Sequence, residues 1–352
     1  MSRPSIDSSV SPSSPKSPGF LKSGAGNTSS PINVQLPYGS VSTGSQLFTQ
    51  ASNCTGRKKA LCIGINYRGQ DDELQGCVND AGRITEFLIR QFGFKKENII
   101  KLTDDAIGSD RLPTKANIVS AMRWLVEDAK ADDSLFFHFS GHGGQTEDLS
   151  GDEIDGYDEI IYPLDFEQSG HIDDDVIHDL IVRPLPRGCR LTALFDCSHS
   201  GTTLDLPYVY TSRGKVKEPS HWVDLGQGLK DAGRSTIRGD MKGTMKGFGS
   251  MFKSETRFQK RVARYAKETR ASPADVIAWA GCKDSERSDD IVEDGETIGA
   301  MSHAFVEVLR KQPQQSYQEL LNNIRDVLQE KYNQKPQLTS SHPIDASALF
   351  II

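Results

Sequence analysis

Short apolar runs alternate with amphipathic segments through most of the chain. The apolar runs are typical of strands buried on both faces of a sheet, and they cover residues 59–65, 98–102, 134–139, 190–195 and 276–280. Segments with apolar residues at helical spacing predict helices at residues 80–92, 114–129, 301–309 and 316–328. Strands that alternate with helices of this length form βαβ units. The pattern therefore predicts an α/β fold with a mostly parallel sheet.

Two segments interrupt this pattern. Residues 1–56 are rich in Ser, Pro, Gly and Asn and have too little apolar surface to offset the entropy of ordering, so we expect them to be disordered. Residues 211–270 contain fifteen Lys and Arg against six Asp and Glu. We expect an exposed basic insertion there, which divides the globular part into residues 57–210 and 271–352.

Charge and cysteine usage limit the classes of function. The formal net charge of −7 argues against nucleic acid as the main partner, because a phosphate backbone attracts a surplus of Lys and Arg. The six cysteines are scattered singly, without the density of a secreted disulfide framework. No segment is apolar enough for a membrane span, and the first thirty residues lack an apolar leader. We therefore expect a cytoplasmic or nuclear protein without a membrane span.

Reactive side chains follow two of the predicted strands. The run 134–139 leads into S-G-H-G-G, which places His142 in a glycine-flanked turn, and the run 190–195 leads into D-C-S-H-S-G. The carboxyl ends of parallel strands meet at one edge of a sheet, where such folds bind their ligands. A lone histidine more often only hydrogen-bonds a loop, but Cys197 and Ser198 at the second strand end favour a catalytic pair.

Five motifs in this order resemble a type I metacaspase, a member of the caspase-like cysteine peptidases: K-A-L-C-I-G-I-N-Y, L-Q-G-C-V-N-D-A, H-F-S-G-H-G-G-Q, D-E-I-I-Y-P-L-D and F-D-C-S-H-S-G-T-T-L-D-L-P-Y. The resemblance implies the caspase-like α/β/α sandwich, a mostly parallel central sheet flanked by helices. It also implies that residues 1–56 are a prodomain and that residues 57–210 and 271–352 are the large- and small-subunit-like regions. In this family the basic insertion contains the calcium-triggered self-cleavage sites after Lys or Arg.

The resemblance assigns a catalytic pair to His142 and position 198. The family's base is the histidine of S-G-H-G, and its nucleophile is the cysteine of D-x-C-H-S-G, which here is Ser198. A thiol ionises readily beside a histidine, whereas a hydroxyl needs a further group, usually a carboxylate that orients the imidazole. Cys197 is a possible substitute thiol, although neighbouring strand residues point to opposite faces. We therefore expect peptidase activity to be weakened or absent.

The resemblance also implies an acidic substrate pocket. Asp80 and Asp196 match the carboxylates that accept Arg or Lys before the cleaved bond, and Cys77 and Ser140 match the pocket's lining. Carboxylates suit a guanidinium because charge-assisted, often bidentate hydrogen bonds form where water is excluded. Asp80 alone could equally cap the following helix, but the two motifs together favour the pocket. We expect basic peptides or proteins as ligands.

A third set of residues is acidic and lies in D-E-I-D-G-Y-D-E, H-I-D-D-D-V and the segment after Ser198. Such charges usually belong to solvated loops. The family's calcium ligands match Asp158, Asp174, Asp175 and Asp205, and clustered carboxylate oxygens suit Ca²⁺ better than a transition metal. We therefore expect Ca²⁺ at this site.

Three interpretations of the whole chain stay open on these grounds. The first is a weakened Ca²⁺-dependent endopeptidase that cleaves after Arg or Lys. The second is a pseudoprotease that binds basic peptides or regulates active metacaspase paralogues. The third is an active metacaspase inactivated by a Cys-to-Ser exchange. In each case we expect a monomer.

Overall fold

The structure is a computed structural model. It describes residues 50–147, 157–198, 203–210, 270, 272–281, 290–293, 296–332 and 334–352. All of them belong to one compact unit, Leu47–Ile352. The Ser/Pro-rich segment up to residue 49 and residues 211–269 of the basic insertion lie outside the described residues. Within the described part of the chain, no helix is both long enough and apolar enough to cross a membrane.

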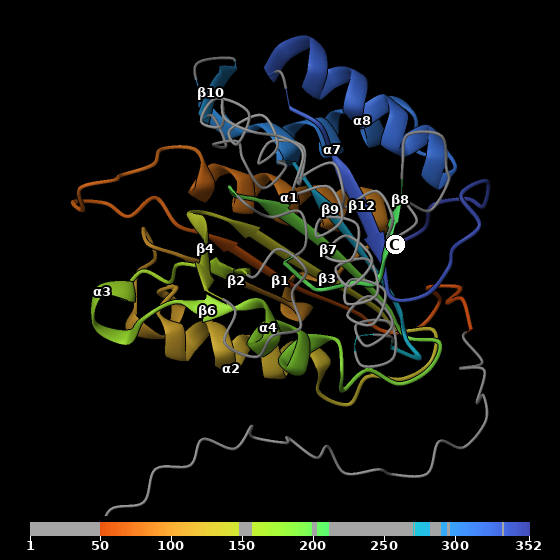
Figure 1. Ribbon diagram of the computed structural model, residues 1–352, viewed down its shortest axis with the longest axis horizontal. Coiled ribbons are helices and arrows are strands. Elements are labelled where there is room, and N and C mark those ends of the chain that lie inside the picture. Colours follow the sequence, from red (N-terminus) through yellow and green to blue (C-terminus); the bar gives the residue numbers. More distant parts are fainter. Residues whose placement is uncertain are drawn as a thin grey trace, which may run out of the picture. The chain divides into compact units, whose positions relative to one another are not determined.

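A seven-stranded sheet forms the centre of this unit (Figure 1), in the spatial order β2-β1-β3-β7-β9-β12-β8. Its five parallel strands are β2 (Ile99–Thr103), β1 (Lys58–Gly64), β3 (Ser134–Ser140), β7 (Arg190–Asp196) and β9 (Asp275–Ala280). Two antiparallel strands extend the β9 side, β12 (Gln337–Ser340) and β8 (Tyr208–Tyr210). The apolar runs of the sequence correspond to the five parallel strands.

Helices cover both faces of the sheet (Figure 1). One layer consists of α1 (Cys77–Phe92), α7 (Ala300–Lys311) and α8 (Tyr317–Tyr332), and the other of α2 (Lys115–Val126) and α4 (Asp174–Ile181). Alternate residues of β1 face the two layers. Leu61 and Ile63 pack in the core with α2 and α4, whereas Ala60 and Cys62 pack in the core with α1, α7 and α8. The predicted α/β/α sandwich is therefore confirmed.

Local hydrogen bonds explain where the helices begin and end. The Thr114 hydroxyl accepts the Asn117 N–H at 3.3 Å and caps α2. The Asp173 carboxylate caps α4 in the same way, at 2.7 Å from Val176 N. α1 ends at Gly93, whose φ of 68° is the left-handed conformation that glycine adopts most easily.

Two smaller sheets lie near the ends of the central strands. One contains β4 (Gly143–Glu147), β5 (Tyr157–Ile161) and β6 (Ile172–Asp173), which pair antiparallel, with the short helix α3 (Phe166–Ser169) between β5 and β6. The other is the hairpin of β10 (Asp290–Glu293) and β11 (Glu296–Gly299), which leads directly into α7. The short 3₁₀ helices η1 (Lys96–Asn98) and η2 (Ser109–Arg111) flank β2.

Residues 50–56, which the sequence analysis placed in the disordered segment, pack on the domain instead. Ser52 is buried, and its N–H donates to Asp275 Oδ2 at 3.0 Å. Arg190 Nη2 donates to the same oxygen at 2.7 Å, and His342 Nε2 lies 3.4 Å from the other carboxylate oxygen. A buried carboxylate thus holds this segment against β9, because the Arg190 guanidinium compensates its charge.

Candidate active site

The ends of β3 and β7 bring the two reactive segments side by side. These strands are parallel neighbours, and Ser140 at the end of β3 pairs with Asp196 at the end of β7. His142 follows Ser140 by two residues, and Cys197 and Ser198 follow Asp196 directly. The position is the carboxyl edge of a parallel sheet, where ligands bind in folds of this type.

The imidazole of His142 is held by two residues of the loop that follows β1. Its Nε2 lies 2.6 Å from the carbonyl oxygen of Asp72. A carbonyl oxygen only accepts hydrogen bonds, so Nε2 carries a hydrogen and Nδ1 is the free acceptor of the neutral ring. The ring of Tyr67 packs on the imidazole, with 4.5 Å between centroids and 35° between planes. This histidine therefore has the defined tautomer and orientation that a general base needs.

Cys197 and Ser198 have different surroundings. The Cys197 side chain is 2% exposed and packs in the same core cluster as Tyr67, whereas Ser198 is partly exposed. Both lie against Gly143, where a Cβ would be 2.2 Å from the Ser198 carbonyl oxygen and 3.1 Å from Cys197 Sγ. A thiol buried in apolar surroundings is a poor nucleophile. The structure thus favours position 198 over position 197 for nucleophilic attack.

Asp80 and Asp196 are buried and converge on one point at the start of α7. A Cβ at Gly299 would lie 2.3 Å from Asp196 Oδ2 and 2.6 Å from Asp80 Oδ2. The Gly299 N–H donates to Asp80 Oδ1 at 2.9 Å, and the Ser140 hydroxyl donates to Asp80 Oδ2 at 2.7 Å. The Ser302 N–H in the first turn of α7 donates to Asp196 Oδ2 at 2.7 Å, where the helix dipole favours an anion.

These contacts fix the direction of both carboxylates, and the donors named above are neutral groups. Cys77, the remaining residue of the predicted pocket, is the buried first residue of α1. Carboxylates in a shared, largely dehydrated place bind a cationic group strongly through charge-assisted hydrogen bonds. The arrangement is chemically suited to a guanidinium or an ammonium group.

A second group of acidic residues lies between β5, α4 and the segment after β7. One carboxylate oxygen each from Glu159, Asp174 and Asp205 lies within 4.8 Å of the others, and all three residues are buried. Burial, together with the charges of Asp205 and Glu159, raises the pKa of Asp174 far above its usual range. Of the four ligands expected from the resemblance, this group contains Asp174 and Asp205. Asp158 and Asp175 do not belong to it.

Arg270 supplies positive charge to this acidic group. Its guanidinium forms an ion pair with Asp205 and a second one with Asp175, through Nη2 at 2.6 Å. Arg270 and Asp205 are both buried, so this attraction is only weakly screened by water. The Arg270 carbonyl oxygen lies 3.3 Å from His178 Nε2 on α4, which holds the backbone at the same place. The guanidinium thus places a positive charge beside Asp205, one of the three clustered carboxylates.

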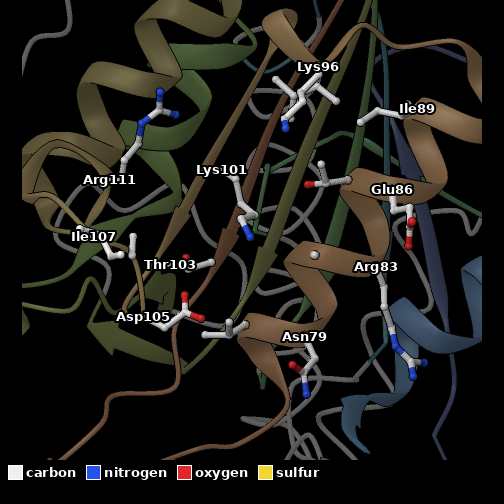
Figure 2. A pocket seen from close by; sticks show the side chains of 15 residues that line it. Asn79, Arg83, Glu86, Ile89, Lys96, Lys101, Thr103, Asp105, Ile107 and Arg111 are labelled. Atoms are coloured by element: carbon white, nitrogen blue, oxygen red, sulfur yellow. The ribbon is translucent and has the colours of Figure 1, made fainter.

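A cleft of about 1040 Å³ lies elsewhere, between α1 and the outermost strand β2 (Figure 2). Its charged lining contains both signs, with Arg83, Lys96, Lys101 and Arg111 beside Glu86 and Asp105. Lys101 lies on the edge strand, where a charged side chain discourages pairing with another sheet. The residues expected to act in catalysis, substrate binding or metal binding do not line this cleft.

A histidine beside a possible nucleophile at the adjacent strand end is an arrangement that nucleophilic hydrolases use. A profile of the metacaspase peptidase C14 domain matches residues 58–207. Metacaspase-1 of Cryptococcus neoformans var. neoformans is 56% identical over 306 residues, covering 87% of this chain and 67% of that protein. Metacaspase-1A of Aspergillus fumigatus is 53% identical over 303 residues, covering 86% of this chain and 73% of that protein. The chain belongs to the metacaspase family and is a type I metacaspase.

Solved structures resemble the chain more distantly. A protein from Geobacter sulfurreducens is 21% identical, with a TM-score of 0.50, and the match covers 82% of this chain and 95% of that one. Caspase-1 from Spodoptera frugiperda is 12% identical, with a TM-score of 0.42 over 81% of this chain and 86% of that one. The first of these likenesses supports the fold alone.

Several residues of the site were not predicted from the sequence. Glu159 could have been considered, because it follows the expected ligand Asp158 in a strand. Adjacent strand residues point to opposite sides, so only one of these two side chains can face the acidic group. Asp72 had none, since it acts through its backbone carbonyl. Arg270 was one of fifteen basic residues in its segment, and nothing in the sequence was a reason to select it. Tyr67 was part of a family motif without an assigned role.

Proposed function

We propose that this metacaspase binds polypeptide segments through an Arg or Lys side chain placed at Asp80 and Asp196. We further propose that its cleavage of the following peptide bond is strongly reduced because position 198 is Ser. The convergence of two buried carboxylates on Gly299, beside the strand end that leads to Ser198, is the observation that carries this proposal. A cationic side chain there would make charge-assisted hydrogen bonds protected from water.

The geometry of His142 supports the proposal that Ser198 is a weak nucleophile. In a competent pair, Nδ1 takes the nucleophile's proton as the nucleophile attacks the carbonyl carbon, and the imidazole becomes positively charged. Serine hydrolases stabilise that charge with a carboxylate on the second nitrogen. In this chain the second nitrogen, Nε2, meets the neutral carbonyl of Asp72. This support suffices for a thiol, which ionises readily, but a hydroxyl lacks the carboxylate that it needs.

We also propose Ca²⁺ as the cation of the acidic group. The donors of Glu159, Asp174 and Asp205 are all carboxylate oxygens, which suits a hard cation, and the presence of Arg270 supports a need for positive charge there. Bound Ca²⁺ would neutralise the carboxylates and hold β5, α4 and the segment after β7 together. Because that segment follows Ser198, the ordering would extend to the nucleophile position.

The test of peptidase function compares this chain with its Ser198→Cys variant on a fluorogenic peptide that ends in Arg, with and without Ca²⁺. The variant should hydrolyse the peptide roughly a thousandfold faster, and only when Ca²⁺ is present. A matched peptide that ends in Asp should stay uncleaved. Cys197→Ala in the same background should keep the activity, since that thiol is buried in the core. If the unmodified chain already cleaves the peptide and Cys197→Ala abolishes that cleavage, Cys197 is the nucleophile.

Peptide binding is tested on the chain as it stands, by calorimetry with an uncleavable Arg peptide. Asp80→Asn should weaken binding by about 2 kcal/mol or more, because it removes one partner of a buried, charge-assisted hydrogen bond. Binding of Arg and Asp peptides with equal affinity would contradict the proposed pocket. Arg-selective binding without any cleavage by Ser198→Cys would support capture of basic peptides as the function in place of hydrolysis.

A further inference from the structure

Tyr67 is a buried residue that packs against the candidate base His142, and its hydroxyl also makes two hydrogen bonds. Its side chain is 1% exposed. The hydroxyl donates to the Tyr162 carbonyl oxygen at 2.6 Å and accepts the His142 backbone N–H at 3.0 Å. One hydroxyl therefore joins the turn that carries His142 to the end of β5.

The same residue also contacts the imidazole itself. The centroids of the Tyr67 and His142 rings are 4.5 Å apart, and the Phe166 ring packs on Tyr67 in a T-shaped arrangement with 6.3 Å between centroids. Asp72, five residues further along the same loop, accepts from His142 Nε2. A single loop thus restrains the imidazole at its face, at its backbone and at one ring nitrogen.

The backbone conformation at Tyr67 and the glycine at position 141 permit these contacts. Tyr67 has a φ of 53°, a conformation that costs free energy for a residue other than glycine and that tends to persist at functional sites. Gly141 precedes His142, and a Cβ there would lie only 3.0 Å from the Tyr67 hydroxyl oxygen. Burial also raises the pKa of Tyr67 well above its ordinary value, so the phenol keeps its hydrogen at neutral pH.

We propose that Tyr67 is a positioning residue for His142, which keeps the imidazole in the Nε2–H tautomer with Nδ1 directed at position 198. The hydroxyl fixes the His142 backbone, the ring limits rotation of the imidazole, and both place Nε2 on the Asp72 carbonyl. When position 198 carries a thiol, Nδ1 takes the thiol proton and the imidazolium keeps its Nε2–H bond to Asp72. The inference rests on the proposed peptidase function only for this last step, since the tautomer is a property of the resting chain.

The first test reads the tautomer without any catalysis. Nitrogen-15 NMR of the His142 ring, assigned with His142→Ala, should show Nε2 protonated and Nδ1 free in the unmodified chain. Tyr67→Phe removes the hydroxyl and keeps the ring, and it should convert this signal to an exchanging mixture of tautomers. The matched control is Tyr210→Phe, which removes another buried hydroxyl that accepts a backbone N–H, from Ile344 at 2.7 Å. This control lies on β8, which three strands, β7, β9 and β12, separate from β3 in the sheet.

The second test reads activation in the Ser198→Cys background. Tyr67→Phe should lower kcat about ten- to a hundredfold with KM changed less than threefold, and it should shift the pH dependence of kcat. Alkylation of the introduced thiol by iodoacetamide, located by mass spectrometry, should slow at neutral pH by a similar factor. Tyr210→Phe should change neither.

The outcomes separate this inference from the proposed function. If Tyr67→Phe leaves the His142 tautomer and the alkylation profile as they are, Tyr67 only supports the fold and the inference is overturned. If Ser198→Cys does not cleave peptides but Tyr67→Phe still disturbs the tautomer, the positioning role stands and the peptidase proposal fails. A change that Tyr210→Phe reproduces would show a general loss of stability and would also overturn the inference.

Discussion

Arg270→Ala is expected to tighten calcium binding while it destabilises the calcium-free protein. In the unmodified chain the Arg270 guanidinium is paired with Asp205 and Asp175, next to the carboxylates proposed to bind Ca²⁺. Removing it leaves the buried carboxylates without that positive charge. The apo protein should therefore unfold at a lower temperature, and Ca²⁺ should restore more stability than it does in the unmodified chain.

The magnitude follows from comparing two ways in which Ca²⁺ could bind. If the guanidinium stayed in place, a doubly charged ion about 5 Å away would repel it by about 7 kcal/mol at an effective dielectric constant of about 20. If the guanidinium moves away, the cost is the loss of its ion pairs, about 1–3 kcal/mol. Displacement is therefore the cheaper route. Arg270→Ala removes this cost, and the dissociation constant for Ca²⁺ should fall about ten- to a hundredfold.

The assay is calorimetric titration with Ca²⁺ after chelation, together with melting curves with and without Ca²⁺. Arg183→Ala is the matched control, because it removes an arginine just after the end of α4, where its ion pair with Asp179 is exposed. That control should alter the Ca²⁺ affinity by less than twofold and the stability by about 0.5 kcal/mol or less. Unchanged or weaker Ca²⁺ binding by Arg270→Ala, in a protein that is folded, would refute the idea that guanidinium and metal compete.

Two further predictions concern the space at Gly299 and the charge of Asp275. Gly299→Ala should weaken binding of the Arg peptide at least tenfold, because the new methyl group would lie 2.3 and 2.6 Å from two carboxylate oxygens. The control is Gly82→Ala on α1, where the methyl group would have no atom within 4 Å and should stabilise the fold by about 0.5–1 kcal/mol. Equal peptide binding by both variants would contradict the proposed pocket. Although burial opposes its charged form, hydrogen bonds and charge from His342 and Arg190 lower the pKa of Asp275 to about 2. Its ionisation therefore adds about 2 kcal/mol at pH 5, and this part is lost as the pH falls from about 4 to 2. Urea unfolding should show that the difference in unfolding free energy between the chain and Asp275→Asn becomes smaller as the pH falls from about 4 to 2. A difference that stays constant over this range would contradict the prediction.

The parallel strands were predictable because both faces of each strand are covered. In β1, neighbouring residues such as Leu61 and Cys62 enter different cores, and both are fully buried. Such a strand is a continuous apolar run, which stands out without knowledge of its neighbours. β8 and β12 have three and four residues, and only their pairing in the sheet identifies them as strands.

The acidic segment around α4 was harder to interpret for a physical reason. H-I-D-D-D-V has the composition of a solvated loop, yet Asp173 caps a helix and Asp174, the next residue, is 1% exposed. Burial of Asp174 depends on Glu159 and Asp205, which come from other parts of the chain. Local composition contains no information about such partners, so only the family resemblance directed attention to this segment.

The contacts of the site are distributed so that the proposed binding and cleavage depend on different residues. Ser140, Gly299 and Ser302 hold the two pocket carboxylates, and Tyr67 and Asp72 hold His142. The named contacts involve atoms other than the side-chain oxygen of Ser198. Exchange of an oxygen for a sulfur at position 198 therefore changes the acidity of the nucleophile while these contacts persist. We expect peptide recognition and calcium affinity to be nearly the same in the chain and in Ser198→Cys, with the difference confined to the rate of the chemical step.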